Sequence, residues 1–389
     1  MLVRTASALE EAATSEVATF EQFLNLRESW NALARVCHDE PFYRHEFLKA
    51  WLESFAPRVP LRIVTRHDSY GTLRAVLPLR AVRGSICGVP VRQLVTLSNT
   101  HSCRFDLLAS DPRDDSEALL AHLLRKPGWD VLVLKDVPED GHAHEMMRAA
   151  AAAGLPTGMW ESQRSPFILM PDSEEDFYTR VSSAFRRNLR RRRRRLEERG
   201  KVTFERLESG PDLEERLTSC LSVESGGWKG RRGTAINQDR RVRDFYARLA
   251  ATASAHGYFA LYTLLLEDQI IAFQYGLCYG DSYYMPKLAY DESLSDCSPG
   301  MLLLQDVLRD CMQRGVNRVD FLGDDMDWKR KWALEVTPHH WLYIFRDTRL
   351  GRALQRAKFR WIPSTRRFLA DLADTVIPRR RGGPPPPDA

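Results

Sequence analysis

The sequence of 389 residues lacks the features of secreted and membrane proteins. It contains no uncharged apolar stretch of the roughly 20 residues that a membrane helix needs. The first 20 residues carry Glu10, Glu11 and Glu16, where a signal peptide needs an unbroken apolar segment. We therefore expect a soluble protein without a membrane span, located in the cytoplasm.

Cysteine and histidine are sparse and scattered. The 7 cysteines include no C-x-x-C pair, and a chain of this length needs no disulfide framework. His142 and His144 form an H-x-H, and His339 and His340 are adjacent, but no further ligand stands at a usual zinc spacing. The sequence therefore predicts reduced thiols, no metal and no permanently bound cofactor.

Positive charge is concentrated in one short segment. Eight arginines lie between Arg186 and Arg195, and the chain carries a net charge of +5, so the remainder stands at +5 less 8, or −3. Because the rest of the chain has a negative net charge, we do not expect nucleic acid to bind over the whole protein surface. The segment is either a polyanion-binding patch in its own right or the basic face of a helix in a catalytic domain.

Length and periodicity predict two α/β domains, because chains of this size usually divide into units of about 150 to 200 residues. Each half begins with helices, continues with antiparallel strands and ends with an α/β crossover. Residues 61–79 are weakly similar to residues 258–276, and residues 129–137 to residues 317–325. This similarity indicates two copies of one unit.

We place the first unit at residues 17–165 and the second at residues 166–348. Residues 349–389 follow as an amphipathic basic helix and a tail whose proline and glycine content is too high for packing.

Residues 284–315 are the segment most informative about chemistry. A strand leads through a polar loop into a helix with Ser298 as its N-cap and Pro299 at its first position. The free amides that follow, from Gly300 onward, can bind an anion such as a pyrophosphate. The commoner meaning of the pattern is a well-capped helix without a ligand.

Two further segments carry candidate site residues. Asp320 lies at the end of a strand, where an acid can accept a proton or position an amine, and Lys329 can stabilise an oxyanion. Equally, Asp320 can cap a loop and Lys329 can be a solvated charge. The glycine-rich loop 224–236 holds Trp228 and Lys229, which suits contact with a phosphorylated or sugar-like ligand or an ordinary exposed loop.

In this order the segments resemble the acetyltransferase-like family named after CelD and BcsL, which lies in the GNAT superfamily and is related to the Fem peptidyltransferases. The matching segments are FRRNLRRRRRRLEERG, ESGGWKG, the hairpin with Ala272 and Gly276, YDESLSDCSPGMLLL and DFLGDDMDWKRKW. The resemblance covers roughly residues 30–345. It implies two tandem GNAT-like units, each a mixed, mainly antiparallel sheet flanked by helices.

The resemblance also implies a reaction. An acyl group would pass directly from acyl-CoA, as co-substrate, to an amine or hydroxyl of a small-molecule, saccharide or lipid-linked acceptor, in polysaccharide or cell-envelope biosynthesis. The second unit would hold the donor.

The candidate site residues fall into three groups, of which the resemblance assigns the first. The donor-binding positions are Met285, Lys287, Ala289, Ser298, Gly300 and Met301. The catalytic candidates are Asp320 and Lys329. The acceptor wall is Trp228, Lys229 and Trp332.

The sequence departs from the usual GNAT pyrophosphate loop. Ser295 replaces its cation and Ser298 its first glycine, and three acids between residues 291 and 296 would repel a phosphate. Two alternatives therefore stay open. One is an aminoacyl-tRNA donor, as in the Fem relatives, and the other is a non-enzymatic nucleic-acid-binding protein that uses Arg186–Arg195.

Overall fold

The computed structural model describes residues 13–57, 59–171, 173–226, 236–332 and 335–361. The strands of these ranges form one continuous sheet of 13 strands. Along the hydrogen-bonded path the order is β1-β2-β3-β4-β6-β13-β7-β12-β11-β10-β9-β8, and β5 pairs with β3 beside this path. The expected fold class, an α/β protein with a mixed, mainly antiparallel sheet flanked by helices, is confirmed.

The elements have the following bounds. The strands are β1 Ala13–Val17, β2 Leu61–His67, β3 Leu73–Ile86, β4 Val89–Thr96, β5 Leu108–Ala109, β6 Val131–Pro138, β7 Thr157–Leu169, β8 Val202–Leu207, β9 Phe259–Leu266, β10 Gln269–Tyr279, β11 Ser282–Tyr290, β12 Arg318–Asp320 and β13 Glu335–Phe345. The helices are α1 Phe20–Asn25, α2 Arg27–Cys37, α3 His45–Phe55, α4 Pro112–Arg125, α5 Ala143–Ala152, α6 Glu174–Arg180, α7 Ser183–Glu197, α8 Leu213–Gly226, α10 Arg240–Ala255, α11 Pro299–Gln313, α12 Asp327–Arg330 and α13 Arg349–Arg356. Short turns of other helix types are η1 Pro41–Tyr43, η2 Ile236–Gln238, η3 Glu292–Cys297 and η4 Ala357–Trp361.

The two halves of the sheet repeat one topology. Residues 61–79 contain the antiparallel pair β2–β3, and residues 258–276 contain the antiparallel pair β9–β10. Ala75 and Ala272, at corresponding places in these hairpins, are both fully buried. β6 pairs in parallel with β4, and β12 pairs in parallel with β11. The weak sequence similarity therefore reflects two structurally equivalent units.

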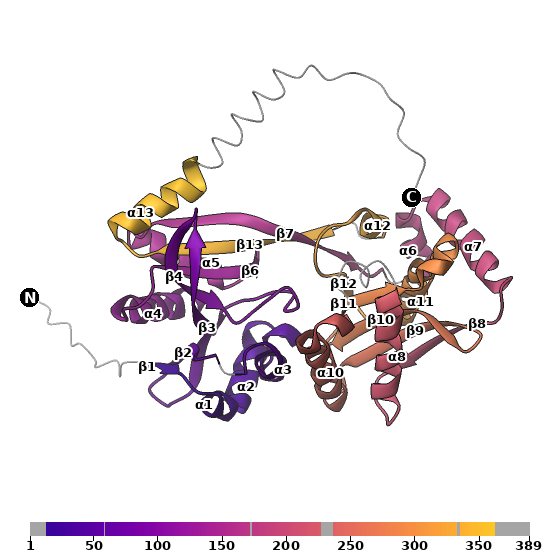
Figure 1. The fold of residues 1–389 in the computed structure, drawn as a ribbon, viewed down its shortest axis with the longest axis horizontal. Coiled ribbons are helices and arrows are strands. Elements are labelled where there is room, and N and C mark those ends of the chain that lie inside the picture. Colours follow the sequence, from indigo (N-terminus) through magenta and orange to yellow (C-terminus); the bar gives the residue numbers. More distant parts are fainter. Residues whose placement is uncertain (1–12, 58, 172, 227–235, 333–334, 362–389) are drawn as a thin grey trace, which may run out of the picture.

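Two long strands, β7 and β13, join the units at the centre of the sheet (Figure 1). Residues 157–167 of β7 pair with β13, and its last residues, 167–169, pair with β12. β13 also pairs with β6, so a strand from the C-terminal part of the chain completes the N-terminal half of the sheet. The sequence patterns did not predict either strand. One sheet contains strands from both sides of residue 165. The division of the chain into two units at this residue therefore stays a proposal.

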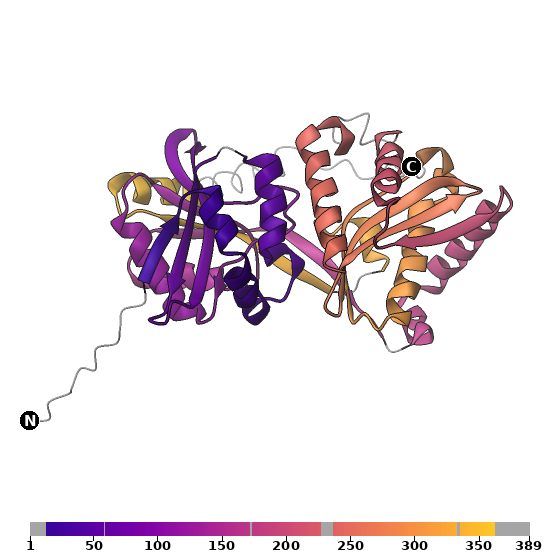
Figure 2. The ribbon, with the colours of Figure 1, turned by 90° about the horizontal axis from the view of Figure 1, so that it is seen from below.

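A helix from each half completes the contact between them (Figure 2). α3 packs against α10, with the Phe245 ring 5.7 Å from the Phe47 ring and 5.3 Å from the Phe55 ring, measured between centroids. These side chains belong to one hydrophobic cluster that contains residues of both halves. The two units thus share a core as well as a sheet.

The arginine-rich segment forms α7. The Ser182 hydroxyl caps this helix by accepting a hydrogen bond from the Phe185 amide at 3.2 Å. Leu189 and Leu196 are buried, and the Phe185 ring packs edge-on against Trp332 with centroids 4.9 Å apart. Phe185, Leu189 and Leu196 therefore form the apolar side of the arginine helix.

Acids of the protein neutralise part of the charge of α7. Arg193 pairs with Asp306 at 2.6 Å, while Arg195 and Arg199 pair with Asp296 at 3.5 Å and 2.5 Å. The other arginines of the run make no ion pair with any residue that the structure describes. They are Arg186, Arg187, Arg190, Arg191, Arg192 and Arg194.

The basic helix expected after residue 349 is α13, whereas the tail from residue 362 lies outside the described residues. Within the described ranges, none of the helices combines the length and the apolar character that crossing a bilayer requires.

We predict that the buried leucines of α7, and not its arginines, stabilise the packing of this helix. Leu196→Ala should lower the free energy of unfolding by about 2–5 kcal/mol, because the change leaves a cavity in the core. Arg194→Ala, on the exposed side of the same helix, should change it by less than about 0.5 kcal/mol. Urea denaturation followed by circular dichroism measures both, and equal effects of the two substitutions would contradict this view of α7.

Candidate functional site

A β-bulge in β11 decides which of its side chains share a face. Tyr275 of β10 is opposite Lys287, but Leu277 is opposite Tyr284, so two steps on β10 correspond to three steps on β11. Met285 consequently packs in the core between the sheet and α11, whereas Ala289 packs in the core on the α10 side.

β11 also separates from β12 at this point. Their parallel pairing ends at Tyr284 and Asp320, although β11 continues to Tyr290. The chain after β12 turns away through Leu322 and Gly323, whose φ angles are 52° and 61°. Beyond Tyr284, this edge of β11 therefore has no strand partner in the part of the chain that the structure describes.

A cavity of about 350 Å³ lies where β11 separates from β12. Its walls come from the end of β11, the beginning of α11, the loop after β12 and the last turn of α8. They consist of Glu224, Leu288, Ala289, Tyr290, Glu292, Ser298, Gly300, Met301, Met326 and Trp328. The wall is thus mostly apolar, with two carboxylates.

The beginning of α11 forms one end of this cavity. Ser298 occupies the N-cap position with φ 48° and ψ 60°, and its hydroxyl donates to the Ser295 carbonyl at 3.2 Å instead of capping the helix. The Ser298 carbonyl accepts hydrogen bonds from the amides of Met301 and Leu302 at 3.0 Å and 3.2 Å. Of the amides expected to bind an anion, only that of Gly300 lacks a partner among the described residues.

Gly300 also lets α11 approach β11 closely. A Cβ atom at this position would lie 3.0 Å from Cδ1 of Tyr290, which is closer than side chains normally pack. A larger residue would therefore push the helix terminus away from the strand and change the cavity.

The structure brings together four of the six expected donor-binding residues. Ala289, Ser298, Gly300 and Met301 line the cavity. Met285 does not, because the bulge directs its side chain to the face of the sheet opposite that of Ala289. Lys287 follows the bulge, as Ala289 does, but it does not line the cavity either. Lys287 instead lies against α10, with its Nζ 5.4 Å from the centroid of the Tyr246 ring.

Glu224 is the residue that sequence reasoning missed. It stands near the end of α8, is only 2% exposed, and one of its oxygens accepts the Ile236 amide at 2.9 Å. Its position in the cavity wall results from the packing of α8 on β10 and β11, to which no local sequence pattern points.

Asp320 lies in a different environment from the one expected for a proton acceptor. Its carboxylate is fully buried, 2.8 Å from Nη2 of Arg104 and 3.2 Å from Nη2 of Arg318. It also accepts hydrogen bonds from the Ser165 hydroxyl and the Leu322 amide. Burial by itself raises the pKa of Asp320, but the two arginines hold that pKa below the ordinary value of an aspartate. These surroundings correct the expected role, because such a carboxylate is a weak base.

Lys329 is also occupied by the protein. Its Nζ donates to the carbonyls of Leu322 and Asp324, so it stabilises the turn that directs the chain away from β11. Burial lowers the pKa of Lys329 to about 8, although neighbouring aspartates oppose the shift. Lys329 is 6% exposed and does not line the cavity, which argues against the expected oxyanion contact.

Trp332 is a core residue and not part of an acceptor wall. It is 2% exposed and packs against Phe177 and Phe185, where it anchors α6 and α7. The remaining candidates for the acceptor wall, Trp228 and Lys229, lie outside the described residues.

The equivalent place in the N-terminal unit is unsuited to an anion. α4 follows β4 as α11 follows β11, and it too begins with a proline, Pro112. Its N-terminus is capped by the carboxylate of Asp111, and Asp114 and Asp115 in its first turn both pair with Arg66, at 2.7 Å and 2.8 Å. Helix N-termini that already hold carboxylates do not attract another anion.

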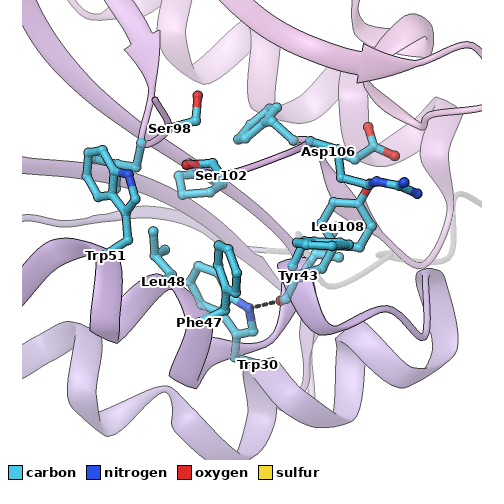
Figure 3. A pocket seen from close by; sticks show the side chains of 14 residues that line it. Trp30, Tyr43, Phe47, Leu48, Trp51, Ser98, Ser102, Asp106 and Leu108 are labelled. Atoms are coloured by element: carbon cyan, nitrogen blue, oxygen red, sulfur yellow. Dashed lines mark hydrogen bonds between the residues drawn. The ribbon is translucent and has the colours of Figure 1, made fainter. Parts of the chain in front are cut away.

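A second cavity, inside the N-terminal unit, is too small for a substrate (Figure 3). Its volume is about 40 Å³, and Trp30 in its wall donates to the Tyr43 carbonyl at 2.9 Å. A water molecule takes up about 30 Å³ in the liquid, so this space suits one water. The cavity between β11 and α11 remains the candidate site.

Comparison with known proteins identifies the part of the chain that carries this site. Residues 183–330 match the family described as "Acetyltransferase (GNAT) domain", which confirms the resemblance for this segment. The chain therefore contains a GNAT domain, and β11, α11 and β12 all lie within it. No curated protein matches the sequence.

Solved structures share the fold at low sequence identity. FemX is 11% identical, with a TM-score of 0.54 over 86% of this chain and 97% of FemX. A conserved protein of unknown function from Bacteroides thetaiotaomicron is 13% identical, with a TM-score of 0.53 over 86% of this chain and 100% of that protein. Both likenesses extend over the two units, so they show that the arrangement of the whole chain is a known fold.

We predict that the main effect of Asp320→Asn is a lower free energy of unfolding. Removing one partner of a buried ion pair should cost about 3–5 kcal/mol, because Arg104 stays buried without its counter-charge. Asp327→Asn is the control, since the exposed pair of Asp327 with Arg330 should contribute little.

The pH dependence of unfolding tests the same carboxylate. A folded-state pKa below the unfolded value, about 3.9, stabilises the protein fully above that value, and the contribution disappears as the pH falls through the folded pKa. Thermal unfolding from pH 7 to pH 2 should therefore show a steeper acid loss for the parent than for Asp320→Asn. Parallel curves would contradict the ion-pair role.

Proposed function

We propose that the GNAT domain transfers an acyl group from an acyl-CoA thioester to an amine or hydroxyl acceptor, and that the donor binds in the cavity between β11 and α11. The observation that carries this proposal is the opening of the sheet beside a helix N-terminus with one free amide. It offers, within the described residues, a stretch of β11 without a neighbouring strand on one side, an apolar wall and a hydrogen-bond donor for an anion in one place.

The described residues fit an elongated thioester donor. Beyond Tyr284, where β12 no longer pairs with β11, backbone groups of β11 can pair with the amide groups of a pantetheine arm as they would pair with a strand. Leu288, Met301 and Trp328 can cover its methylene groups, and the Gly300 amide can donate to a pyrophosphate oxygen. Burial of the thioester among these side chains would exclude water from the reaction.

The carboxylates of the cavity favour an acceptor that carries an amine. Glu224 and Glu292 give the wall negative charge, which attracts an ammonium group. We propose Glu224 as the proton acceptor in place of Asp320. The ammonium group would first give a proton to Glu224, the neutral amine would then attack the carbonyl carbon of the thioester, and the CoA thiolate would leave and take up the second proton of the nitrogen as the free thiol.

The acceptor and its pathway remain part of the proposal. Relatives of the CelD and BcsL type suggest a small-molecule, saccharide or lipid-linked acceptor used in polysaccharide or cell-envelope biosynthesis, with the reaction on the cytoplasmic side. No residue of the cavity distinguishes among these acceptors.

A second candidate function is favoured by α7. The six arginines that make no ion pair with a described residue lie on one helix of the same domain, and such a helix suits a polyanionic backbone. An aminoacyl-tRNA donor, or nucleic-acid binding without catalysis, would use this surface.

Calorimetric titration with acetyl-CoA, a long-chain acyl-CoA and tRNA distinguishes these functions. Binding of a thioester with a micromolar Kd would support the acyl-CoA donor. Binding of tRNA alone, with an affinity that falls steeply as salt rises, would overturn it in favour of the nucleic-acid alternatives.

We predict that filling the cavity blocks donor binding. Met301→Trp should weaken acyl-CoA binding at least tenfold, because the larger side chain occupies the space beside β11. Met147→Trp, a partly buried methionine of α5 outside the cavity, should leave the Kd unchanged. The same calorimetric titration measures both variants, and full affinity in Met301→Trp would exclude this cavity as the donor site.

We predict that Glu224→Gln separates chemistry from donor binding. Loss of a general base should lower kcat by about 10²–10⁴-fold while the Kd for acyl-CoA stays within about twofold. Glu215→Gln, an exposed position on the same helix, is the matched control. Release of CoA thiol in the presence of candidate amines gives the rate, and an unchanged kcat would remove Glu224 from the reaction.

A further inference from the structure

Three side chains from distant segments of the N-terminal unit meet outside the acyltransferase cavity. His38 follows α2, Asp106 precedes β5 and His142 precedes α5. One ring nitrogen of each histidine and one carboxylate oxygen of Asp106 all lie within 4.8 Å of one another. The expectation of no metal rested on sequence spacing, which does not reveal this group.

The fold fixes the carboxylate of Asp106 firmly. Its side chain is fully buried, and Oδ1 accepts hydrogen bonds from the amides of Leu107 and Ala143, both at 2.8 Å. Oδ2 accepts the His142 amide at 2.7 Å. Backbone hydrogen bonds of this kind orient the carboxylate ligands of metal ions.

Both histidines leave a buried ring nitrogen without a hydrogen bond. Nε2 of His38 and Nδ1 of His142 are inaccessible to water and find no hydrogen-bond partner among the described residues. Nε2 of His38 is 2.7 Å from Oδ2 of Asp106 but lacks the alignment of a hydrogen bond. The two rings stand 4.1 Å apart between centroids.

A simple hydrogen-bonded pair of His38 and Asp106 would explain only half of this arrangement. It would orient one imidazole, but Nδ1 of His142 would stay buried and unpaired, which is unfavourable for a polar atom. A cation among the three groups satisfies both ring nitrogens and the carboxylate together.

We propose that His38, Asp106 and His142 bind a divalent transition metal ion, with Zn²⁺ as the ion that fits best. Two imidazoles and one carboxylate without a thiolate are a ligand set that Zn²⁺ accepts. A water molecule would take the fourth position. The ion would join the end of α2, the segment before β5 and the beginning of α5.

His144 stands apart from this set although it lies two residues after His142. Its Nε2 contacts the Pro138 carbonyl at 3.0 Å, so that nitrogen is already engaged. The site therefore uses three ligands of the protein, and it is independent of the proposed acyl transfer.

Titration of the full chain after removal of metals with a chelator tests this site. We expect one Zn²⁺ ion per chain with a Kd in the micromolar range or below by calorimetry. His38→Gln and His142→Gln should each weaken binding at least tenfold. His256→Gln, an exposed histidine on the end of α10, should leave the Kd unchanged.

A measurement on the unaltered chain keeps the test valid if a variant fails to fold. X-ray absorption at the zinc edge should show the scattering pattern of two imidazole ligands and one or two oxygen ligands. Zinc binding that is absent, that keeps its affinity in both histidine variants, or that shows only oxygen ligands would overturn the proposal.

Discussion

The structure depends on a buried ion pair between its two units. Arg104 of the N-terminal unit contacts Asp320 at the end of β12, and its other amino group contacts Glu40 at 3.0 Å. Arg104 is 6% exposed and Asp320 is fully buried, so neither charge can find water as a substitute. A pair of this kind is costly to break although it adds little to stability when compared with apolar side chains. Its effect is to fix one arrangement: β12 ends at Asp320, the chain turns away, and β11 continues without a partner.

The candidate site follows from that arrangement. Since β12 stops where the ion pair holds it, a cavity opens between β11 and α11. Lys329 supports the same opening by binding the carbonyls of the turn. Asp320 and Lys329, which looked catalytic in the sequence, thus serve the shape of the site, while Glu224, the first residue of the segment ESGGWKG, reaches its wall. Charged residues near an active site can position its backbone without taking part in the reaction.

The two units share one topology but differ in the ligands that they can bind. α11 offers an amide at its beginning, whereas the equivalent terminus of α4 is filled by aspartates of the protein. The N-terminal unit instead brings together His38, Asp106 and His142. Among the arginines of α7, Arg193 and Arg195 are neutralised by aspartates of the domain.

The sequence by itself determined the local elements and the duplication. Apolar periodicity gave the two hairpins, α7 and α11, because these segments bury one face against their own unit. It could not give β7 and β13, because these strands are paired only through contacts between the two units. Ala289 and Met301 line the cavity because their positions follow from the order of strand, loop and helix. Met285, Asp320 and Trp332 were misplaced because a bulge, an ion pair across the units and packing against α7 decide their surroundings. These three causes join residues far apart in the chain, and only the tertiary structure contains them.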